Sequence, residues 1–104
     1  MTINVQIHDC SARIAISGHF EFKVHRDFRK AYISLIDNTA IREIEIEMSM
    51  VDYLDSSALG MLVLLNERAK AVHKSVALLN TFGKALQVLE IANFNKIFNF
   101  KSAV

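Results

Sequence analysis

Three glutamates occupy every second position of residues 43–47, and apolar residues alternate with them. This period of two is the period of side chains along a β-strand. It predicts a strand over residues 44–50 that has an acidic face in water and an apolar face in a core. The apolar face consists of Ile44, Ile46, Met48 and Met50. Strands that alternate in this way build a sheet that is covered on one face and solvated on the other.

Two segments near the N-terminus have the same alternation. Residues 3–7 predict a first strand and residues 13–17 predict a second, which we expect Gly18 to end. The turn-like residues 8–11 lie between them and predict a hairpin. The first two strands should therefore be antiparallel, because a short turn can join strands only in that orientation.

Amphipathic helices are predicted between the later strands. Apolar residues recur at helical spacing over residues 23–37, 57–72 and 83–92, and Thr81 is placed to cap the last helix. The apolar run 75–80 predicts a more central strand, and residues 96–100 predict a final one. The order β-β-α-β-α-β-α-β implies mostly parallel pairing with right-handed crossovers. We predict a two-layer α/β domain, with a mixed sheet of about five strands and helices mainly on one face.

The composition narrows the functional classes. A length of 104 residues fits one domain over residues 1–104, and 52% hydrophobic residues supply its core. The net charge of +1 argues against a nucleic-acid-binding protein, which would carry a basic patch. Cys10 is the only cysteine, and no apolar run approaches the ~20 residues that span a membrane. Residues 1–6 do not have the pattern of a signal peptide, so we expect a cytoplasmic protein without membrane insertion.

The residue types that often carry catalysis are not arranged for it. Gly18, Gly60 and Gly83 do not form a phosphate-binding loop or a dinucleotide-binding motif. The four histidines lack metal-ligand spacing, and Ser57 lacks the flanking glycines of a hydrolase nucleophile. The glutamates of residues 43–47 are expected to form a solvated face. We therefore expect a protein that is not an enzyme and has no metal and no cofactor.

Acidic and hydroxyl side chains meet where the strand that begins at residue 44 leads into the helix 57–72. Asp52, Asp55, Ser56 and Ser57 lie within six positions of the chain. The first N–H groups of a helix lack partners and favour negative charge. Either Asp55 or Ser56 can act as the N-cap. A cap alone does not explain two consecutive serines, and Ser57 would present a free hydroxyl in the first helical turn.

The helix 57–72 carries two neighbouring stripes. The apolar stripe, which should face the sheet, consists of Ala58, Leu62, Leu65, Ala69 and Val72. The second stripe consists of Ser57, Met61, Leu64 and Arg68. Met61 and Leu64 either extend the core or form a docking patch beside the hydroxyl. Gly60 costs about 1 kcal/mol of helix stability relative to alanine, which indicates either close packing or the close approach of a partner.

Residues 55–60, Asp-Ser-Ser-Ala-Leu-Gly, resemble the Asp-Ser-Ser/Thr-Gly-Leu-Gly motif of STAS domains. The likeness is greatest to the bacterial anti-sigma factor antagonists. Residues 18–21 resemble the Gly-x-Leu-Asp segment of that family, and residues 91–98 resemble its Leu-x-Gly-Leu-x-x-x-Phe segment. The resemblance therefore covers nearly the whole chain.

The resemblance implies a phosphorylation switch. In that family the second hydroxyl of the pair is phosphorylated by a serine kinase of the histidine-kinase-like ATPase type, which is often also the binding partner or anti-sigma factor. A PP2C-type phosphatase removes the phosphate, and the unphosphorylated form binds the partner. By motif position the acceptor is Ser57, with Ser56 as the alternative. The predicted partner-binding residues are Glu21, Asp52, Asp55, Ser56, Ala58, Gly60, Met61, Leu64 and Arg68.

This sequence departs from the family pattern in three places. Ala58 replaces a glycine, Glu21 replaces an aspartate, and the usual C-terminal helix is expected to be missing after Phe100. Two other functions are compatible with the family. One is a non-switching STAS subunit of an ATPase complex that transports lipids. The other is a nucleotide sensor, which the lack of phosphate-binding residues disfavours.

Overall fold

The computed structural model describes residues 2–102 and contains the predicted order of elements. The strands are β1 (Thr2–His8), β2 (Ser11–Phe20), β3 (Glu43–Leu54), β4 (Ser75–Leu79) and β5 (Asn99–Lys101). The helices are α1 (His25–Asp37), α2 (Ser56–Ala71) and α3 (Gly83–Ile91). Two short 3₁₀ turns, Phe22–Val24 and Phe94–Lys96, precede α1 and β5.

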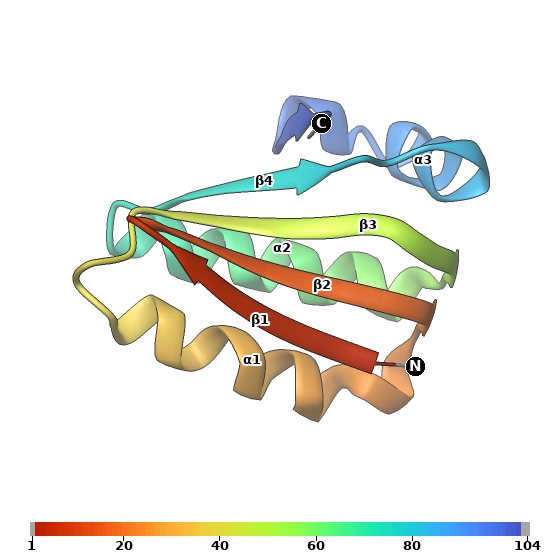
Figure 1. The fold of residues 1–104 in the computed structure, drawn as a ribbon. Coiled ribbons are helices and arrows are strands. Elements are labelled where there is room, and N and C mark those ends of the chain that lie inside the picture. The colour runs from red at the N-terminus through yellow and green to blue at the C-terminus, as the bar shows by residue number, and fades with distance from the viewer. Residues whose placement is uncertain (1, 103–104) are drawn as a thin grey trace.

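The strands form one sheet in the order β1-β2-β3-β4-β5. β1 is antiparallel to β2, and every other neighbouring pair is parallel, as the sequence predicts. Each parallel connection steps in the same direction across the sheet, so crossovers of one hand place their helices on one face. Figure 1 shows α1 and α2 side by side on that face. The predicted two-layer α/β fold is confirmed.

The core lies between this face of the sheet and the helices. Alternate residues of β2 and β3 are almost completely buried, among them Ile14, Ile16, Ile44 and Ile46. Helix α1 adds Phe28, Tyr32 and Leu35, and α3 adds Ala85 and Leu89 to the same cluster. From α2 the cluster receives Ala58, Leu62, Leu65 and Ala69, which belong to the predicted stripe. The fifth member of that stripe, Val72, lies after the end of α2 and is exposed.

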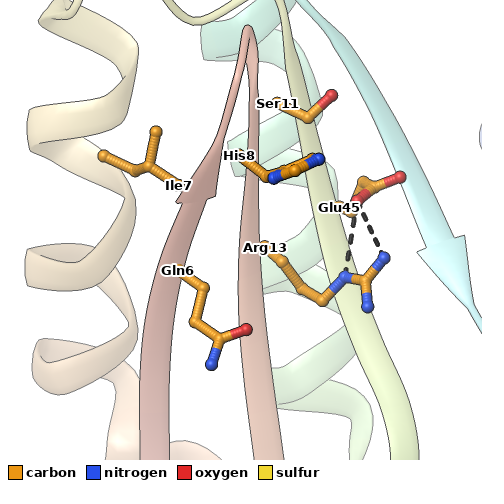
Figure 2. Close-up of a pocket in the computed structure, with 6 residues that line it drawn as sticks. All are labelled: Gln6, Ile7, His8, Ser11, Arg13 and Glu45. Carbon is orange, nitrogen blue, oxygen red and sulfur yellow. Dashed lines mark hydrogen bonds and ion pairs between the residues drawn. The ribbon is translucent and has the colours of Figure 1, made fainter.

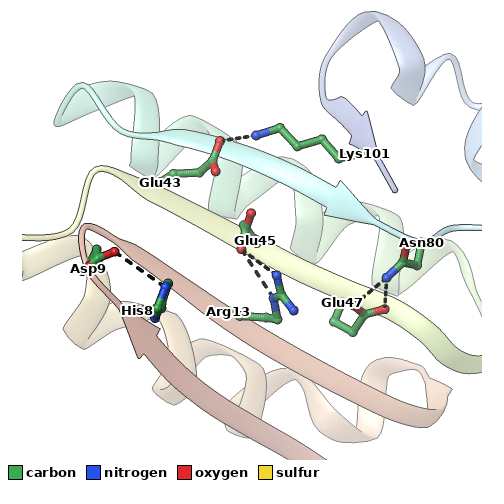
Figure 3. A network of polar contacts seen from close by, with 8 residues as sticks. All are labelled: His8, Asp9, Arg13, Glu43, Glu45, Glu47, Asn80 and Lys101. Carbon is green, nitrogen blue, oxygen red and sulfur yellow. Dashed lines mark hydrogen bonds and ion pairs between the residues drawn. The ribbon is translucent and has the colours of Figure 1, made fainter. Parts of the chain in front are cut away.

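Among residues 2–102 no helix covers the opposite face of the sheet, but the acidic side chains of that face are paired. Arg13 contacts Glu45 at 3.4 Å (Figure 2), and Lys101 contacts Glu43 at 2.9 Å. Asn80 donates to Glu47 at 2.9 Å, so the three glutamates join side chains from three other parts of the chain (Figure 3). The expected solvated face is therefore a half-buried polar network rather than a row of free carboxylates.

The strands β2 and β3 extend further than predicted. β2 continues through Gly18 to Phe20, and β3 continues to Leu54. The pairing of β2 with β3 shifts twice, between Ala15 and Ser17 and again between Gly18 and His19, with one extra β3 residue at each shift. Such irregularities move side chains to the other face of a strand. The prediction that Met50 continues the apolar face is therefore wrong: its side chain is 68% exposed, and Val51 and Leu54 are buried instead.

The C-terminal third departs from the prediction in smaller ways. Thr81 does not cap α3, because the N-cap residue is Phe82 and no side chain caps it. Residues 96–98 are not extended, and β5 begins at Asn99. No helix follows β5 up to residue 102. Residues 103 and 104, which belong to the segment predicted to lack a helix, lie outside the described residues.

Lys74 is a buried lysine directly before β4. Its Nζ donates hydrogen bonds to the backbone oxygens of Asn38, at 2.7 Å, and Ile41, in the connection from α1 to β3. We predict that Lys74→Met lowers the free energy of unfolding by about 1–3 kcal/mol, because these carbonyl groups lose their donor.

Urea denaturation measures this loss. Lys70→Met is the matched control, because Lys70 is exposed and a surface substitution of this kind should change the unfolding free energy by less than about 0.5 kcal/mol. Equal stabilities of the two variants would contradict a bridging role for Lys74.

Candidate functional site

The junction of β3 and α2 is fixed by a helix cap. Asp55 is the N-cap residue of α2, with extended backbone, and its carboxylate accepts a hydrogen bond of 2.9 Å from the backbone N–H of Ala58. Of the two predicted caps, Asp55 is therefore the one used. Ser56 is exposed and Ser57 is half-buried. Within the described residues, neither serine hydroxyl takes part in a hydrogen bond, so both are available.

The end of β2 lies beside this junction. Phe20 is paired with Leu54, and the N–H of Asp55 donates to the carbonyl of Phe20 at 3.3 Å. The connections β2–α1 and β3–α2 therefore leave the sheet next to each other, as expected for the carboxyl ends of adjacent parallel strands. Glu21 begins the first connection and forms an ion pair with Lys23 at 3.1 Å.

Ser57 opens into a cavity of about 380 Å³ between α1 and α2, which we call the α1–α2 groove. Its walls are mostly apolar, with the buried rings of Phe28 and Tyr32 among them. Phe22 and His25 also line it, and their rings stack at 4.4 Å. The complete lining is Phe22, His25, Phe28, Arg29, Tyr32, Ser57, Gly60, Met61 and Leu64.

The sequence allows Met61 and Leu64 either to extend the core or to form a docking patch, and their exposure in the groove distinguishes these alternatives. Met61 is half-buried, packs against the core and also lines the groove. Leu64 lines the groove with 42% of its surface exposed. Gly60 is not needed for packing within the chain, because an added Cβ would have no neighbouring atom within 4 Å. This stretch of α2 therefore leaves an apolar surface open beside the hydroxyl of Ser57.

Other predicted residues lie outside the groove. Glu21 and Asp52 line a second hollow, of about 520 Å³, at the ends of β2 and β3. Asp52 contacts His19 there at 3.5 Å. Arg68 is exposed further along α2. Ala58 is fully buried, as its place in the predicted apolar stripe implies, so its side chain is not available to a partner and its inclusion among the partner-binding residues is wrong.

Sequence reasoning missed the α1 side of the groove. Phe22, His25 and Arg29 precede the serine pair by about thirty positions, and no local pattern connects them with it. The apolar spacing of α1 identifies Phe28 and Tyr32 as core residues, but it does not indicate which helix they face. The packing of α1 beside α2 brings these residues to Ser57.

A larger hollow lies elsewhere, on the open face near the amino ends of β2 and β3. It has a volume of about 710 Å³, and Figure 2 shows its side chains arranged along three strands. Its ionisable side chains are Arg13 and Glu45, which are paired with each other, and His8, which contacts Asp9 at 3.6 Å. Its large apolar side chain is Ile7, whereas the walls of the α1–α2 groove are mostly apolar and include the serine hydroxyl, so the α1–α2 groove is the better candidate.

No group of three or more His, Cys, Asp or Glu side chains within residues 2–102 is placed to hold a metal ion. In the same part of the chain, none of the helices combines the length and apolar character needed to cross a membrane.

Comparison with known proteins agrees with this architecture. The family model described as "Mlab, STAS domain" matches residues 3–99. A STAS-domain containing protein of Pseudomonas aeruginosa (strain UCBPP-PA14) is 39% identical over 87 residues, which are 82% of this chain and 82% of the relative.

Solved structures share the fold at low sequence identity. An anti-sigma-factor antagonist (STAS) domain protein from Planctomyces limnophilus has a TM-score of 0.85 and 16% identity, with 98% of this chain and 91% of that chain covered. The Bacillus cell fate determinant SpoIIAA in its phosphorylated form has a TM-score of 0.78 and 16% identity, with 99% and 92% covered.

The TM-scores establish a common fold, and the family match and the Pseudomonas relative establish the family. The chain belongs to the STAS domain family and has the fold of its anti-sigma factor antagonists.

Proposed function

We propose that this protein is a binding switch controlled by phosphorylation of Ser57. A partner serine kinase of the histidine-kinase-like ATPase type, which can itself be an anti-sigma factor, binds the unphosphorylated form and phosphorylates it. A PP2C-type phosphatase restores the hydroxyl. The observation that carries the proposal is the position of Ser57, whose unpaired hydroxyl opens into an apolar groove at the start of α2.

In this proposal the chain is a substrate and a ligand, and the chemistry belongs to its partners. The kinase transfers the γ-phosphoryl group of ATP to the Ser57 oxygen, so an O–P bond forms, ADP leaves and the hydroxyl proton passes to a base of the kinase. The phosphatase later hydrolyses the ester with water. Because the kinase needs ATP, the proposal includes a cytoplasmic location for the switch.

The start of α2 can accept the phosphate without loss of the fold. A phosphoserine adds about −1.5 to −2 charges at neutral pH. A negative group near a helix N-terminus gains about 0.3–1 kcal/mol at an exposed site. The fold similarity to SpoIIAA, whose structure is known in a phosphorylated form, supports this point.

The same phosphate opposes docking of a partner. The groove beside Ser57 is largely apolar, and a partner that fills it would bury the phosphate near the carboxylate of Asp55. Burying a charge without a partner costs several kcal/mol, and each 1.4 kcal/mol changes affinity tenfold. The proposed recognition surface has Gly60, Met61 and Leu64 at its centre. Glu21, Asp52, Ser56 and Arg68 surround it.

A second candidate function uses the same surface without phosphorylation. The matching family is described as "Mlab, STAS domain", which favours a STAS subunit that holds an ATPase of a lipid-transport complex. In that case Ser57 would contact the ATPase but would not be phosphorylated. The variants of Ser57 described next distinguish the two functions.

We expect Ser57→Ala to retain binding to the cognate kinase and Ser57→Asp to weaken it roughly tenfold or more, because the new carboxylate must be desolvated in the groove. Isothermal titration calorimetry measures both affinities. Ser34→Ala and Ser34→Asp are the matched controls, because Ser34 is an exposed residue of α1 that does not line the groove. Mass spectrometry after incubation with kinase and ATP should locate phosphate in residues 52–68 of the native chain and none there in Ser57→Ala.

Equal binding by both Ser57 variants, with no phosphate in that segment, would refute the switch and favour the non-switching subunit.

We also predict opposite effects of Gly60→Ala on stability and binding. The unfolding free energy should rise by about 1 kcal/mol, because alanine favours the helix and its Cβ meets no atom within 4 Å. Partner affinity should fall, because the added methyl group narrows the groove. Ser34→Ala is the control, since it replaces an exposed residue of α1 that does not line the groove.

Denaturation measures the free energy of unfolding, and calorimetry on the same preparations measures the affinity for the partner. Undiminished affinity of Gly60→Ala would mean that the partner does not approach this part of α2.

A further inference from the structure

Arg29 and Ser57 lie on opposite walls of the α1–α2 groove, Arg29 on α1 and Ser57 on α2. Arg29 is exposed, and within the described residues its guanidinium has neither an ion pair nor a hydrogen bond. Other basic side chains, such as Arg13 and Lys101, are paired with glutamates on the open face of the sheet. A free guanidinium across a groove from a phosphate acceptor is a suitable phosphate ligand, because its planar donors match phosphate oxygens in pairs.

The space between the two walls is open. Gly60 carries no side chain, and a Cβ added there would have no atom within 4 Å. The rings of Phe28 and Tyr32 form apolar parts of the lining. Apolar surroundings strengthen a pair of opposite charges relative to water. An anion on Ser57 would therefore be drawn toward Arg29.

Among the residues that line the groove, Arg29 carries the permanent positive charge. Asp55 repels an anion on Ser57, although its carboxylate already accepts the N–H of Ala58. His25 also lines the groove, and its Nδ1 is in hydrogen-bond contact with the carbonyl of Phe22 at 2.8 Å. Lys30 follows Arg29 in the chain but lines a different hollow, between α1 and β1.

We infer that phosphorylated Ser57 is bound by Arg29 of the same chain, so that the phosphate ties α1 to α2 across the groove. This inference rests on Ser57 as the phosphate acceptor. It adds a second physical reason why the phosphorylated form would not bind the partner. The modified chain fills its own docking groove with a paired phosphate, in addition to presenting a charge that a partner must desolvate.

The test uses the full chain with phosphoserine installed at position 57 during translation, so no kinase is needed. Titration followed by phosphorus NMR gives the second pKa of the phosphate, about 6 in free phosphoserine. A nearby cation favours the dianion and lowers this pKa. We expect Arg29→Gln to raise the pKa by about half a unit or more, a threefold change in proton affinity. Arg29→Lys should give a smaller rise, since lysine keeps the charge but not the paired donors.

Lys30→Gln is the matched control, because it removes the same charge one position away, and it should shift the pKa by less than about 0.2 unit. Equal shifts in Arg29→Gln and Lys30→Gln, large or small, would overturn the inference, since the phosphate would then sense only the general charge of α1. Circular dichroism checks that both exposed-site variants are folded.

Failure of the Arg29 pairing can be distinguished from failure of the proposed switch. A normal kinase-dependent switch with no specific effect of Arg29 would reject the pairing alone. A specific effect of Arg29 in a chain that no kinase phosphorylates would reject the switch alone.

Discussion

Burial of one face of the sheet dictates where the helices of this protein lie and where a groove can form between them. The apolar residues of β2 and β3 can leave water only if helices cover them, and the same alternation places Arg13 and the glutamates on the other side. Because consecutive parallel strands step in one direction, α1 and α2 must lie next to each other on the covered face. The groove between them follows from this arrangement.

The irregular pairing of β3 with β2 adapts the sheet to the site. Two extra residues in β3 turn Met50 and Tyr53 outward and return Leu54 to the core directly before the helix cap. Asp55 can then accept the N–H of Ala58 while its own N–H bonds to Phe20. Such irregularities often occur beside functional sites because they redirect side chains without ending the strand. Here they fix the point at which the chain leaves β3 and the two serines begin α2.

The two faces of the molecule suit different tasks. On the open face the principal charges are paired within the chain, so that face offers little electrostatic attraction to a partner (Figure 3). The α1–α2 groove combines apolar walls, a free hydroxyl and a free guanidinium. In the proposed switch, this surface binds an apolar group of the partner when Ser57 is unmodified and the chain's own phosphate when Ser57 is modified. That switch would need no change in the backbone.

The order of elements, the strand orientations and the position of the hydroxyl pair at a helix start all follow from the sequence. These properties depend on local periodicity, on turns and on the cap, all of which are short-range. It left open whether Asp55 or Ser56 caps α2, it placed Met50 in the core, and it assigned Ala58 both to the stripe facing the sheet and to the partner-binding residues. The packing of the folded chain resolves these points and brings Phe22, His25 and Arg29 to Ser57. The reason is that β3 separates α1 from α2 along the chain, so their contact depends on how both helices cover the sheet.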